Sequence, residues 1–538
     1  MKRSMFFLRI ISLCLILVML LSACAKNPAT DPTNTPPTPN EPSADNTEQP
    51  PEKPANDFNA RSFVTYNNIN GKDVNVHSFC IQYKEVQNNP NFAQAVMLWQ
   101  AIRYKDTHPE EDVYATISSF HFSVVLSACL DEKSEQYGTM KNLYDSDFTD
   151  DGYYRISYLC VEAARKGIHI TVIGQIDASP VYISETATRN DYSFAGYFYS
   201  HLNDAAYIEG KTVKDFMNFR HAKWLSYGDK SATDMMHLKL CTVSNYRDNA
   251  GVDHGTAVWI GSINLDGIDF RGINGNNGTQ TAVVITEHDE LYRVFYNYVN
   301  LLKDFCEQED ALTFRTLANA MTTAQIDLIR AGKGNQIPAD EQIVYLGTES
   351  DSVFKLYMTP FGGSANAWNT AYNPYCTYLA ELAEAAKGDD SIEFFWNSPK
   401  YKQNFELGES MMQVLATAFE TSANKNNRLH LNFLEAEGFT PELFSTLQQG
   451  ENIGYISVNE SNVYYHSKDV HLSYVKDGIR HYVTLINTLN LHEGSMCYQS
   501  NIFLVIDETK ATGNQFYSDY LTLLMPTMTV EQVAKSDQ

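Results

Sequence analysis

The sequence predicts an α/β protein made of two similar halves. Strand-like and helix-like segments alternate along most of the chain, which is typical of βαβ units. The order of these segments repeats after about 230 residues, a period typical of a duplicated domain rather than a solenoid. Each half also holds a strand with His and Lys two positions apart. We therefore expect two pseudo-symmetric α/β/α lobes, each with a central mixed sheet.

The first residues are typical of a secretory signal peptide. Two basic residues precede an apolar run, residues 6–21, that is short for a membrane span. The run ends in Leu-Ser-Ala-Cys, which resembles the lipobox of bacterial lipoproteins. This resemblance implies that residues 1–23 are removed and that the thiol of Cys24 is acylated. We expect an extracytoplasmic protein, lipid-anchored to the bacterial cell membrane; a plain transmembrane anchor is the alternative.

The composition argues against several classes of protein. The chain has 538 residues, of which 43% are hydrophobic, and a formal net charge of −25. This charge argues against a broad nucleic-acid-binding surface, since such a surface needs clustered Lys and Arg. Beyond Cys24, seven cysteines are widely spread and form no C-x-x-C pair, so neither a disulfide framework nor a zinc site is predicted. We expect most of them to be small buried side chains.

Composition also sets the predicted boundaries. The segment after the signal is rich in Pro and Thr and has no aromatic residue, so it predicts a disordered linker. The globular body begins near Phe58, and a polar helical stretch separates its two halves. The predicted units are the lipidated cysteine and linker (24–57), lobe 1 (58–306), a connector (307–342) and lobe 2 (343–530).

Both lobes follow the same succession of helices and strands. In the first, the patterns predict a helix over 91–104, a strand over 113–122, a helix that ends at Lys166-Gly167, and a buried strand over 168–173. In the second, they predict helices over 376–390 and 410–427, each followed by a strand, over 391–398 and 428–435. Both orders fit a layered α/β lobe.

The pattern His-x-Lys occurs at His221, His237 and His466, and context separates the three. After His237 and His466 come a strand, a turn-rich hairpin and a second strand, which ends in a hydroxyl residue and then Asn. The period of a strand places His and Lys on one face. The first copy, at His221, lacks this sequel and is predicted to be surface or loop.

The paired arrangement resembles the phospholipase D superfamily, whose signature is H-x-K-x4-D followed by G-S-x-N, present twice in one chain. The matching segments are His237-Leu-Lys239 with Gly261-Ser-Ile-Asn264, and His466-Ser-Lys468 with Asn487-Thr-Leu-Asn490. The resemblance covers roughly residues 58–507. It implies phospholipase D-like lobes with one active site between them, and we expect a monomer.

The chain departs from this pattern at several positions. Ser244 and Ser473 stand where most members carry the acidic residue, and the second copy begins with Asn487 instead of Gly. The spacing to the Asn element is longer than usual in both copies. The tyrosyl-DNA phosphodiesterase branch of the superfamily also lacks the acidic residue. The two serines therefore do not by themselves imply an inactive protein, although they leave a non-catalytic protein open.

The resemblance implies roles for eight residues. His237 is the expected nucleophile and His466 the expected general acid and base, and the reverse assignment stays open. The other six are expected to bind the phosphate or to support its binding: Lys239, Lys468, Asn264, Asn490, Ser262 and Thr488. Asp469 and His471 are interpreted as strand neighbours of the second motif.

These residue types suit phosphodiester chemistry. Lysines can hold the non-bridging oxygens and stabilise the charge of the transition state, and Asn, Ser and Thr add neutral donors. One imidazole can attack phosphorus to form a phosphohistidine, while the other moves the proton of the leaving alcohol. No cofactor and no metal are expected, since the lysines supply the positive charge.

The sequence therefore predicts a membrane-anchored, extracytoplasmic phosphodiesterase of the phospholipase D type. A phospholipid is favoured over a nucleic acid as substrate, because of the anchor and the acidic composition. Transfer to an alcohol in place of hydrolysis stays open. The alternatives are a nuclease of the same superfamily and a degenerate binding lipoprotein that has kept the fold without the reaction. A two-lobed solute-binding lipoprotein would not explain the two matched hairpins.

Overall fold

In the computed structural model, the residues described below all belong to one unit, Ala55–Gln538. The described residues are 58, 60–69, 71–82, 90–119, 156–175, 198, 200–222, 237–265, 277–307, 346–347, 353–359, 393–402, 428–437, 463–465, 467–492, 501–510 and 513–524.

The first sheet has nine strands, and all but one come from the range predicted for lobe 1, residues 58–306. Strands β3, β4 and β5 are parallel neighbours, whereas β3, β6, β9, β10, β2 and β1 pair antiparallel in that order. The bounds are β1 Ser62–Ile69, β2 Lys72–Gln82, β3 Tyr114–Ser119, β4 His169–Gln175, β5 Met217–Ala222, β6 Lys239–Val243, β9 Ala257–Gly261, β10 Asn277–Thr286 and β15 Val463–Tyr465.

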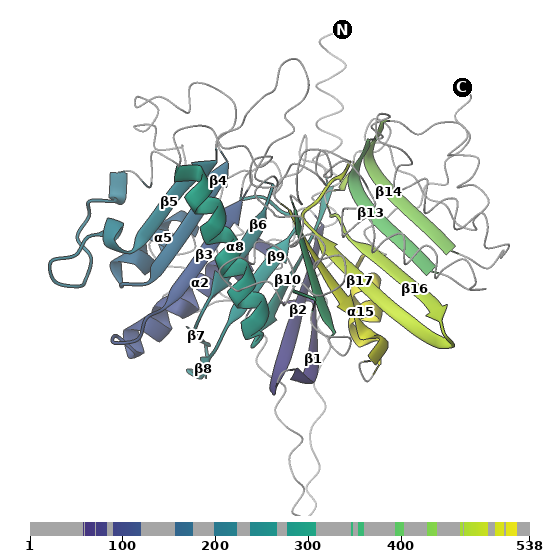
Figure 1. Cartoon of the computed structure of the whole chain (residues 1–538), viewed down its shortest axis with the longest axis horizontal. Coiled ribbons are helices and arrows are strands. Elements are labelled where there is room, and N and C mark those ends of the chain that lie inside the picture. Colours follow the sequence, from purple (N-terminus) through teal and green to yellow (C-terminus); the bar gives the residue numbers. More distant parts are fainter. Residues whose placement is uncertain are drawn as a thin grey trace, which may run out of the picture. The chain divides into compact units, whose positions relative to one another are not determined.

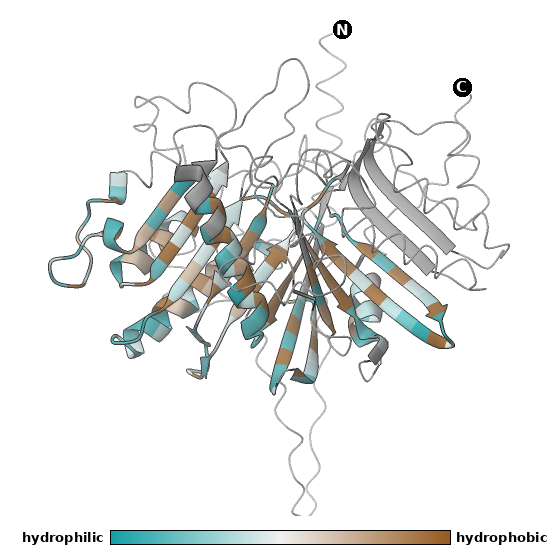
Figure 2. Ribbon diagram, in the orientation of Figure 1, coloured by the Kyte–Doolittle hydropathy of each residue, from teal (hydrophilic) through white to brown (hydrophobic). Residues whose placement is uncertain are grey.

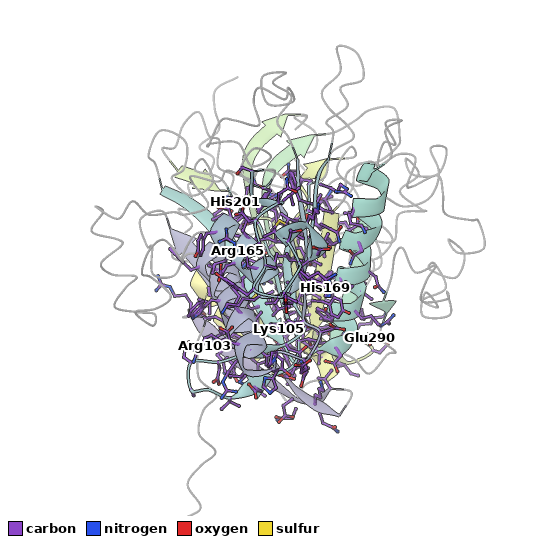
Figure 3. All side chains as sticks on the ribbon, turned by 90° about the vertical axis from the view of Figure 1, so that its left-hand side faces the viewer. Arg103, Lys105, Arg165, His169, His201 and Glu290 are labelled. Atoms are coloured by element: carbon purple, nitrogen blue, oxygen red, sulfur yellow. The ribbon has the colours of Figure 1, made fainter. Side chains whose placement is uncertain are left out.

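Helices cover both faces of this sheet. Helices α2 (Pro90–Thr107) and α5 (Ile156–Arg165) share one apolar core with Trp259 and Val284, which lie on neighbouring strands. Helix α8 (Asp289–Glu307) crosses the front of the sheet in Figure 1 and contacts β3, β4, β5, β6 and β9. Figure 3 shows the two layers from the side, with Arg103 of α2 and Glu290 of α8 on opposite sides of the sheet.

The end of α5 shows how local sequence determines this architecture. Gly167 has a φ of +87°, and its N–H donates to the carbonyl of Ala164 while the next N–H donates to Ala163. A residue without Cβ adopts this left-handed conformation at little cost, so glycine ends the helix there. The chain then turns directly into β4, as the sequence predicts.

The second sheet has eight strands. Their order is β11-β12-β19-β17-β16-β13-β14, with β18 paired to β13. The bounds are β11 Leu346–Gly347, β12 Phe354–Thr359, β13 Glu393–Lys402, β14 Arg428–Glu437, β16 Val470–Lys476, β17 Ile479–Asn487, β18 Leu491–His492 and β19 Asn501–Asp507. A short 3-10 helix, Glu508–Lys510, and helix α15, Gln515–Leu524, follow β19.

Six strands of each sheet follow one matching pattern. In the first sheet the order is β2-β10-β9-β6-β3-β4, and in the second it is β12-β19-β17-β16-β13-β14. In both, every neighbouring pair is antiparallel except the last, which is parallel. The predicted fold class, α/β with central mixed sheets, is confirmed. Figure 2 shows hydrophobic residues along the strands of both sheets.

The two sheets are joined by contacts that the sequence does not predict. Strand β15, which comes from the range predicted for lobe 2, pairs parallel with β10 of the first sheet and extends it. The hydroxyl of Tyr66 on β1 donates to Glu508 after β19 (3.0 Å), and Ser62 donates to Asp519 of α15 (3.0 Å). The second half therefore contributes a strand to the first sheet.

Several predicted elements can be compared directly with the structure. The predicted first helix is α2, the predicted strand over 391–398 overlaps β13, and the one over 428–435 lies within β14. Asp477-Gly478 forms the turn between β16 and β17 with positive φ angles. The turn-rich segment after β6 forms a small hairpin of β7 (Tyr246–Arg247) and β8 (Asp253–His254).

His221 does not lie in a loop. This residue lies in β5, at the edge of the first sheet and paired with Gly174 of β4. The alternation of Met217 and Phe219, both buried, makes this segment a strand. Other predictions lie outside the described residues: the signal and linker, the connector after Glu307, and the helices over 376–390 and 410–427.

Among the described helices, none is both long and apolar enough to cross a membrane.

Candidate active site

The first motif lies at the start of β6, in the middle of the first sheet. His237 is buried, and its Nδ1 lies 3.0 Å from Oδ1 of Asn501, the first residue of β19 in the second sheet. Lys239 is also buried, and its ammonium donates to the carbonyl oxygen of His237 at 3.0 Å. An imidazole of the first half is thus oriented by an amide of the second.

The second motif occupies the equivalent place before β16. Ser467, Lys468 and Asp469 are buried, and the carbonyl of Lys468 accepts a 2.6 Å hydrogen bond from Nδ2 of Asn487. His466 lies outside the described residues. The residue before it, Tyr465, is the last of β15 and pairs with Thr279 of β10.

The hydroxyl residues predicted to support phosphate binding hold two loops in matched ways. After β9, the N–H of Ser262 donates to the carbonyl of Thr281, and Oγ of Ser262 accepts from the N–H of Thr281 at 3.0 Å. After β17, Thr488 makes the same pair of bonds with Ile502, at 3.1 and 3.0 Å. Thr281 and Ile502 are therefore counterparts, and each hydroxyl ties the loop that carries the following Asn to the next strand.

The two predicted asparagines follow these anchored turns. Asn264 is buried, and its carbonyl accepts from Nδ2 of Asn91 in the first turn of α2 at 3.1 Å. Asn490 is half-buried, and its Oδ1 has no hydrogen-bond partner among the described residues. The loop conformation that presents Asn264 thus depends on a helix residue that the sequence does not single out.

Two further amides lie beside the predicted residues. Ser262 donates to Oε1 of Gln280 at 2.8 Å, and Thr488 donates to Oδ1 of Asn501 at 3.2 Å. Each amide immediately precedes the counterpart residue, Thr281 or Ile502. A partial signal exists in the sequence: Asn501 begins an otherwise apolar strand, and Gln280 stands at the matching position of β10, shortly before the apolar run 282–285.

Contacts between the two sheets run in both directions at this place. Asn501, which contacts His237, belongs to the second sheet, and Thr281, whose hydroxyl donates to Asp469 at 2.6 Å, belongs to the first. Asp469 directly follows Lys468. Each motif is thereby connected to the strand that follows the Asn element of the other half, so the two motifs converge on one region.

Ser244 and Ser473 lie away from this region. Ser244 follows β6, five residues beyond Lys239, which is roughly 16 Å along a strand. Its hydroxyl accepts from the N–H of Tyr114 at 3.0 Å, so it closes the end of the β3–β6 pair. Ser473 lies in β16, where its hydroxyl is 3.5 Å from Nη1 of Arg480 on the neighbouring strand. Both serines contact strand neighbours.

One acidic group is buried beside the second motif. Asp469 is completely buried, and this burial raises the pKa of its carboxyl to about 7, against the opposing effects of the Thr281 hydrogen bond and the Lys468 charge. Within the described ranges, no group of three or more His, Cys, Asp or Glu side chains is placed to hold a metal ion. Cys80, Cys160 and Cys241 are buried.

This arrangement suits an anionic ligand. It brings a buried imidazole, two buried lysines and amide side chains from both sheets to one region. The hydrogen bond to Asn501 places a proton on Nδ1 of a neutral His237, because the amide oxygen accepts but cannot donate. Its Nε2 then carries the lone pair that a nucleophile or a base needs.

No protein-family model and no curated protein matches this chain. Solved structures do match. A polyphosphate kinase from Porphyromonas gingivalis has a TM-score of 0.42 and 11% identity, over 84% of this chain and 50% of that one. This chain therefore spans about half the length of that kinase. A phosphatidylserine synthase from Haemophilus influenzae also has a TM-score of 0.42 and 11% identity, with 81% and 86% covered. A yeast tyrosyl-DNA phosphodiesterase has a TM-score of 0.34 and 6% identity, with 74% and 83% covered.

Proposed function

We propose that this chain is a phosphodiesterase of the phospholipase D superfamily, which cleaves a phosphodiester through a phosphohistidine intermediate. The observation that carries the proposal is the hydrogen bond between His237 and Asn501. It joins a His-x-Lys motif of one sheet to the strand behind the second Asn element. This contact, together with the matched strand orders, is what a single site made from two duplicated halves requires.

The first chemical step forms the phosphohistidine. Nε2 of His237 attacks phosphorus while the bond from phosphorus to the leaving oxygen breaks. The lysines and asparagines hold the non-bridging oxygens, whose negative charge grows in the transition state. His466, as the general acid, supplies the proton that the leaving alkoxide needs.

The second step regenerates the enzyme. His466, now neutral, takes a proton from water, and the hydroxide formed attacks phosphorus while the bond to Nε2 of His237 breaks. The products are the phosphomonoester and the free histidine. Asn501 keeps the imidazole of His237 in one orientation through both steps, which is the usual effect of a hydrogen-bonded neighbour on a reactive side chain.

A phospholipid is the substrate that we propose, hydrolysed outside the cytoplasm by an enzyme anchored through acylated Cys24. The support comes from the sequence, since a protein held at a membrane by lipid meets phospholipid headgroups at high local concentration. Cys24→Ala tests the anchor: the variant should leave the membrane fraction of an expressing bacterium and should not incorporate labelled palmitate.

Activity can be tested with the body from residue 58 onward. It should hydrolyse bis-(p-nitrophenyl) phosphate or phosphatidylcholine vesicles in the presence of EDTA. His237→Ala and His466→Ala should each lower kcat by roughly 10²–10⁴-fold. His108→Ala is a matched control, because this half-buried histidine lies at the end of α2 and should leave kcat unchanged.

The intermediate shows which histidine is the nucleophile. After an alkaline quench, mass spectrometry should find the phosphoryl group on the peptide that carries His237, and it should accumulate in His466→Ala. A phosphoryl group on His466 would reverse the assignment. A folded protein without turnover of any phosphodiester would favour a binding lipoprotein, and cleavage of single-stranded DNA alone would favour a nuclease.

A further inference from the structure

Asp469 is an ionisable side chain that the proposed reaction does not use. It directly follows Lys468, is completely buried, and connects the two sheets through the 2.6 Å hydrogen bond that Thr281 donates to its Oδ2. Its other oxygen, Oδ1, has no hydrogen-bond partner among the described residues. Burial of a carboxylate costs free energy unless the charge is paired and both oxygens are hydrogen-bonded.

Four ionisable groups surround this carboxyl. Lys468 acts on it through its positive charge, and the hydroxyl of Tyr520 on α15 approaches it. Cys80 of β2 pairs with Thr281 of β10, and the electrostatic effect of its thiol contributes to the raised pKa of Tyr520. His471 packs against the ring of Tyr520, and burial lowers its pKa to about 3, so it is neutral. Lys468 is therefore the one cation among these four groups.

The duplicated halves show that the fold does not require a polar pair here. The counterpart of Asp469 is Leu240, which follows Lys239, and the counterpart of Thr281 is Ile502. Both are completely buried and apolar. The counterparts of Asp469 and Thr281 are thus Leu240 and Ile502, and each of these two pairs takes one residue from each half. The polar pair therefore occurs only beside Lys468, and the fold itself does not require it.

The charge of Asp469 affects what Lys468 can bind. An ionised carboxylate beside the lysine competes with an anionic ligand for its positive charge, whereas a neutral carboxyl does not. Because burial holds the pKa of Asp469 at about 7, either form is accessible near neutral pH. A bound dianion disfavours a second negative charge nearby and so favours the protonated form.

We propose that Asp469 is a positioning residue that couples the binding of a tetrahedral dianion at Lys468 to the uptake of one proton from solvent. The only bond formed is O–H on the Asp469 carboxylate, and the proton comes from the buffer. Neutral Asp469 no longer competes with the ligand for the charge of Lys468, and it keeps the hydrogen bond from Thr281. This inference depends on the proposed function, because it takes Lys468 to be an anion-binding residue.

The test uses sulfate, a tetrahedral dianion that does not titrate near neutral pH. Calorimetric titration in two buffers of different ionisation enthalpy gives the number of protons taken up per sulfate bound. Asp469→Asn should take up fewer protons than wild type at pH 7, and its sulfate Kd should rise less steeply from pH 6 to pH 8. The wild-type Kd should rise by up to about tenfold per pH unit for one linked proton, above the pKa of the group.

Two further variants separate coupling from a structural role. Tyr66→Phe removes another hydroxyl–carboxyl bond between the sheets, at the far end of β19, and should leave the proton number unchanged. The double variant Asp469→Leu/Thr281→Ile installs the apolar residue types of the counterparts Leu240 and Ile502. It should fold, bind sulfate and lack the proton that wild type takes up there, so it answers the question even where Asp469→Asn does not fold.

Each outcome decides between the two proposals. Equal proton uptake by wild type and the Asp469 variants would overturn the coupling and leave the phosphodiesterase proposal intact. Sulfate binding with the expected proton difference, but without turnover of a phosphodiester, would support the coupling and overturn the catalytic proposal. Failure of the wild type to bind sulfate would overturn both.

Discussion

Nδ1 of His237 lies 3.0 Å from Oδ1 of Asn501, so the imidazole of the first motif is held by the first residue of β19 in the other sheet. Asn501 also accepts from Thr488, which anchors the loop of the second Asn element. One amide thus fixes both the orientation of an imidazole and the place of a loop. This double role leads to the first prediction.

Asn501→Ala should lower kcat by roughly 10–100-fold, because His237 loses the acceptor that fixes its orientation and its protonated nitrogen. KM should change less, since Thr488 keeps its two hydrogen bonds with the backbone of Ile502, which still hold the loop of the second Asn element. Asn300→Ala is the control: this amide accepts from Thr171 at 3.0 Å on the α8 side of the sheet and should not affect kcat. Steady-state kinetics on a chromogenic phosphodiester measures both variants, and equal losses would contradict the assignment.

Asn501→Asp should change the pH profile of the same reaction. A carboxylate beside Nδ1 stabilises the imidazolium, so the pKa of His237 should rise. The nucleophile must be neutral, and the acid limb of kcat/KM should therefore move to higher pH. An acid limb that stays in place would show that His237 is not the group that has to lose a proton.

Gly261→Ala should damage the first Asn element. A Cβ at this position would lie 2.6 Å from Cβ of Ala282 and 2.8 Å from the carbonyl oxygen of Thr281, so β9 and β10 would have to separate. Overpacking of this kind typically costs about 1–3 kcal/mol. We expect a lower melting temperature and a higher KM, because Ser262 and Asn264 follow directly.

The residue at the counterpart of Gly261 is Asn487, whose side chain donates a hydrogen bond to the carbonyl of Lys468. Asn487→Ala should therefore keep the strand pairing but weaken substrate binding.

Ser244→Asp, which restores the acidic residue of the superfamily signature, should change kcat/KM by less than about twofold, since Ser244 lies roughly 16 Å along the strand from Lys239. Ser244→Ala should lower the free energy of unfolding by about 1 kcal/mol, through loss of the hydrogen bond from Tyr114. Kinetics and urea denaturation measure the two effects. A large gain in activity in Ser244→Asp would mean that a carboxylate at this position affects the active site.

The sequence predicts the fold class and the strands that carry the first motif, because both depend on local periodicity and on turn residues such as Gly167 and Asp477-Gly478. It does not predict Asn501, Gln280 or Asn91, whose roles arise from contacts with residues far away in the chain. The pairing of β15 with β10 is missed for the same reason. The strand that contains His221 is also missed, although buried Met217 and Phe219 alternate along it.

The pH dependence of stability should carry the signature of Asp469. The native state keeps this proton up to a pH of about 7, because burial raises the pKa of the carboxyl, whereas the unfolded chain releases it near the usual pKa of 3.8. Between these values the native state binds more protons, so the contribution of Asp469 to stability falls as pH rises and is lost above about pH 7. Buried His77 and His471, with pKa values lowered to about 3, act in the opposite direction between pH 3 and pH 6.5.

The contribution of these histidines drops out when Asp469→Asn is compared with wild type. Relative to wild type, the variant should gain stability on the order of a few kcal/mol from pH 4 to pH 8. Urea denaturation at several pH values measures this difference, and a difference independent of pH would mean that Asp469 stays ionised throughout.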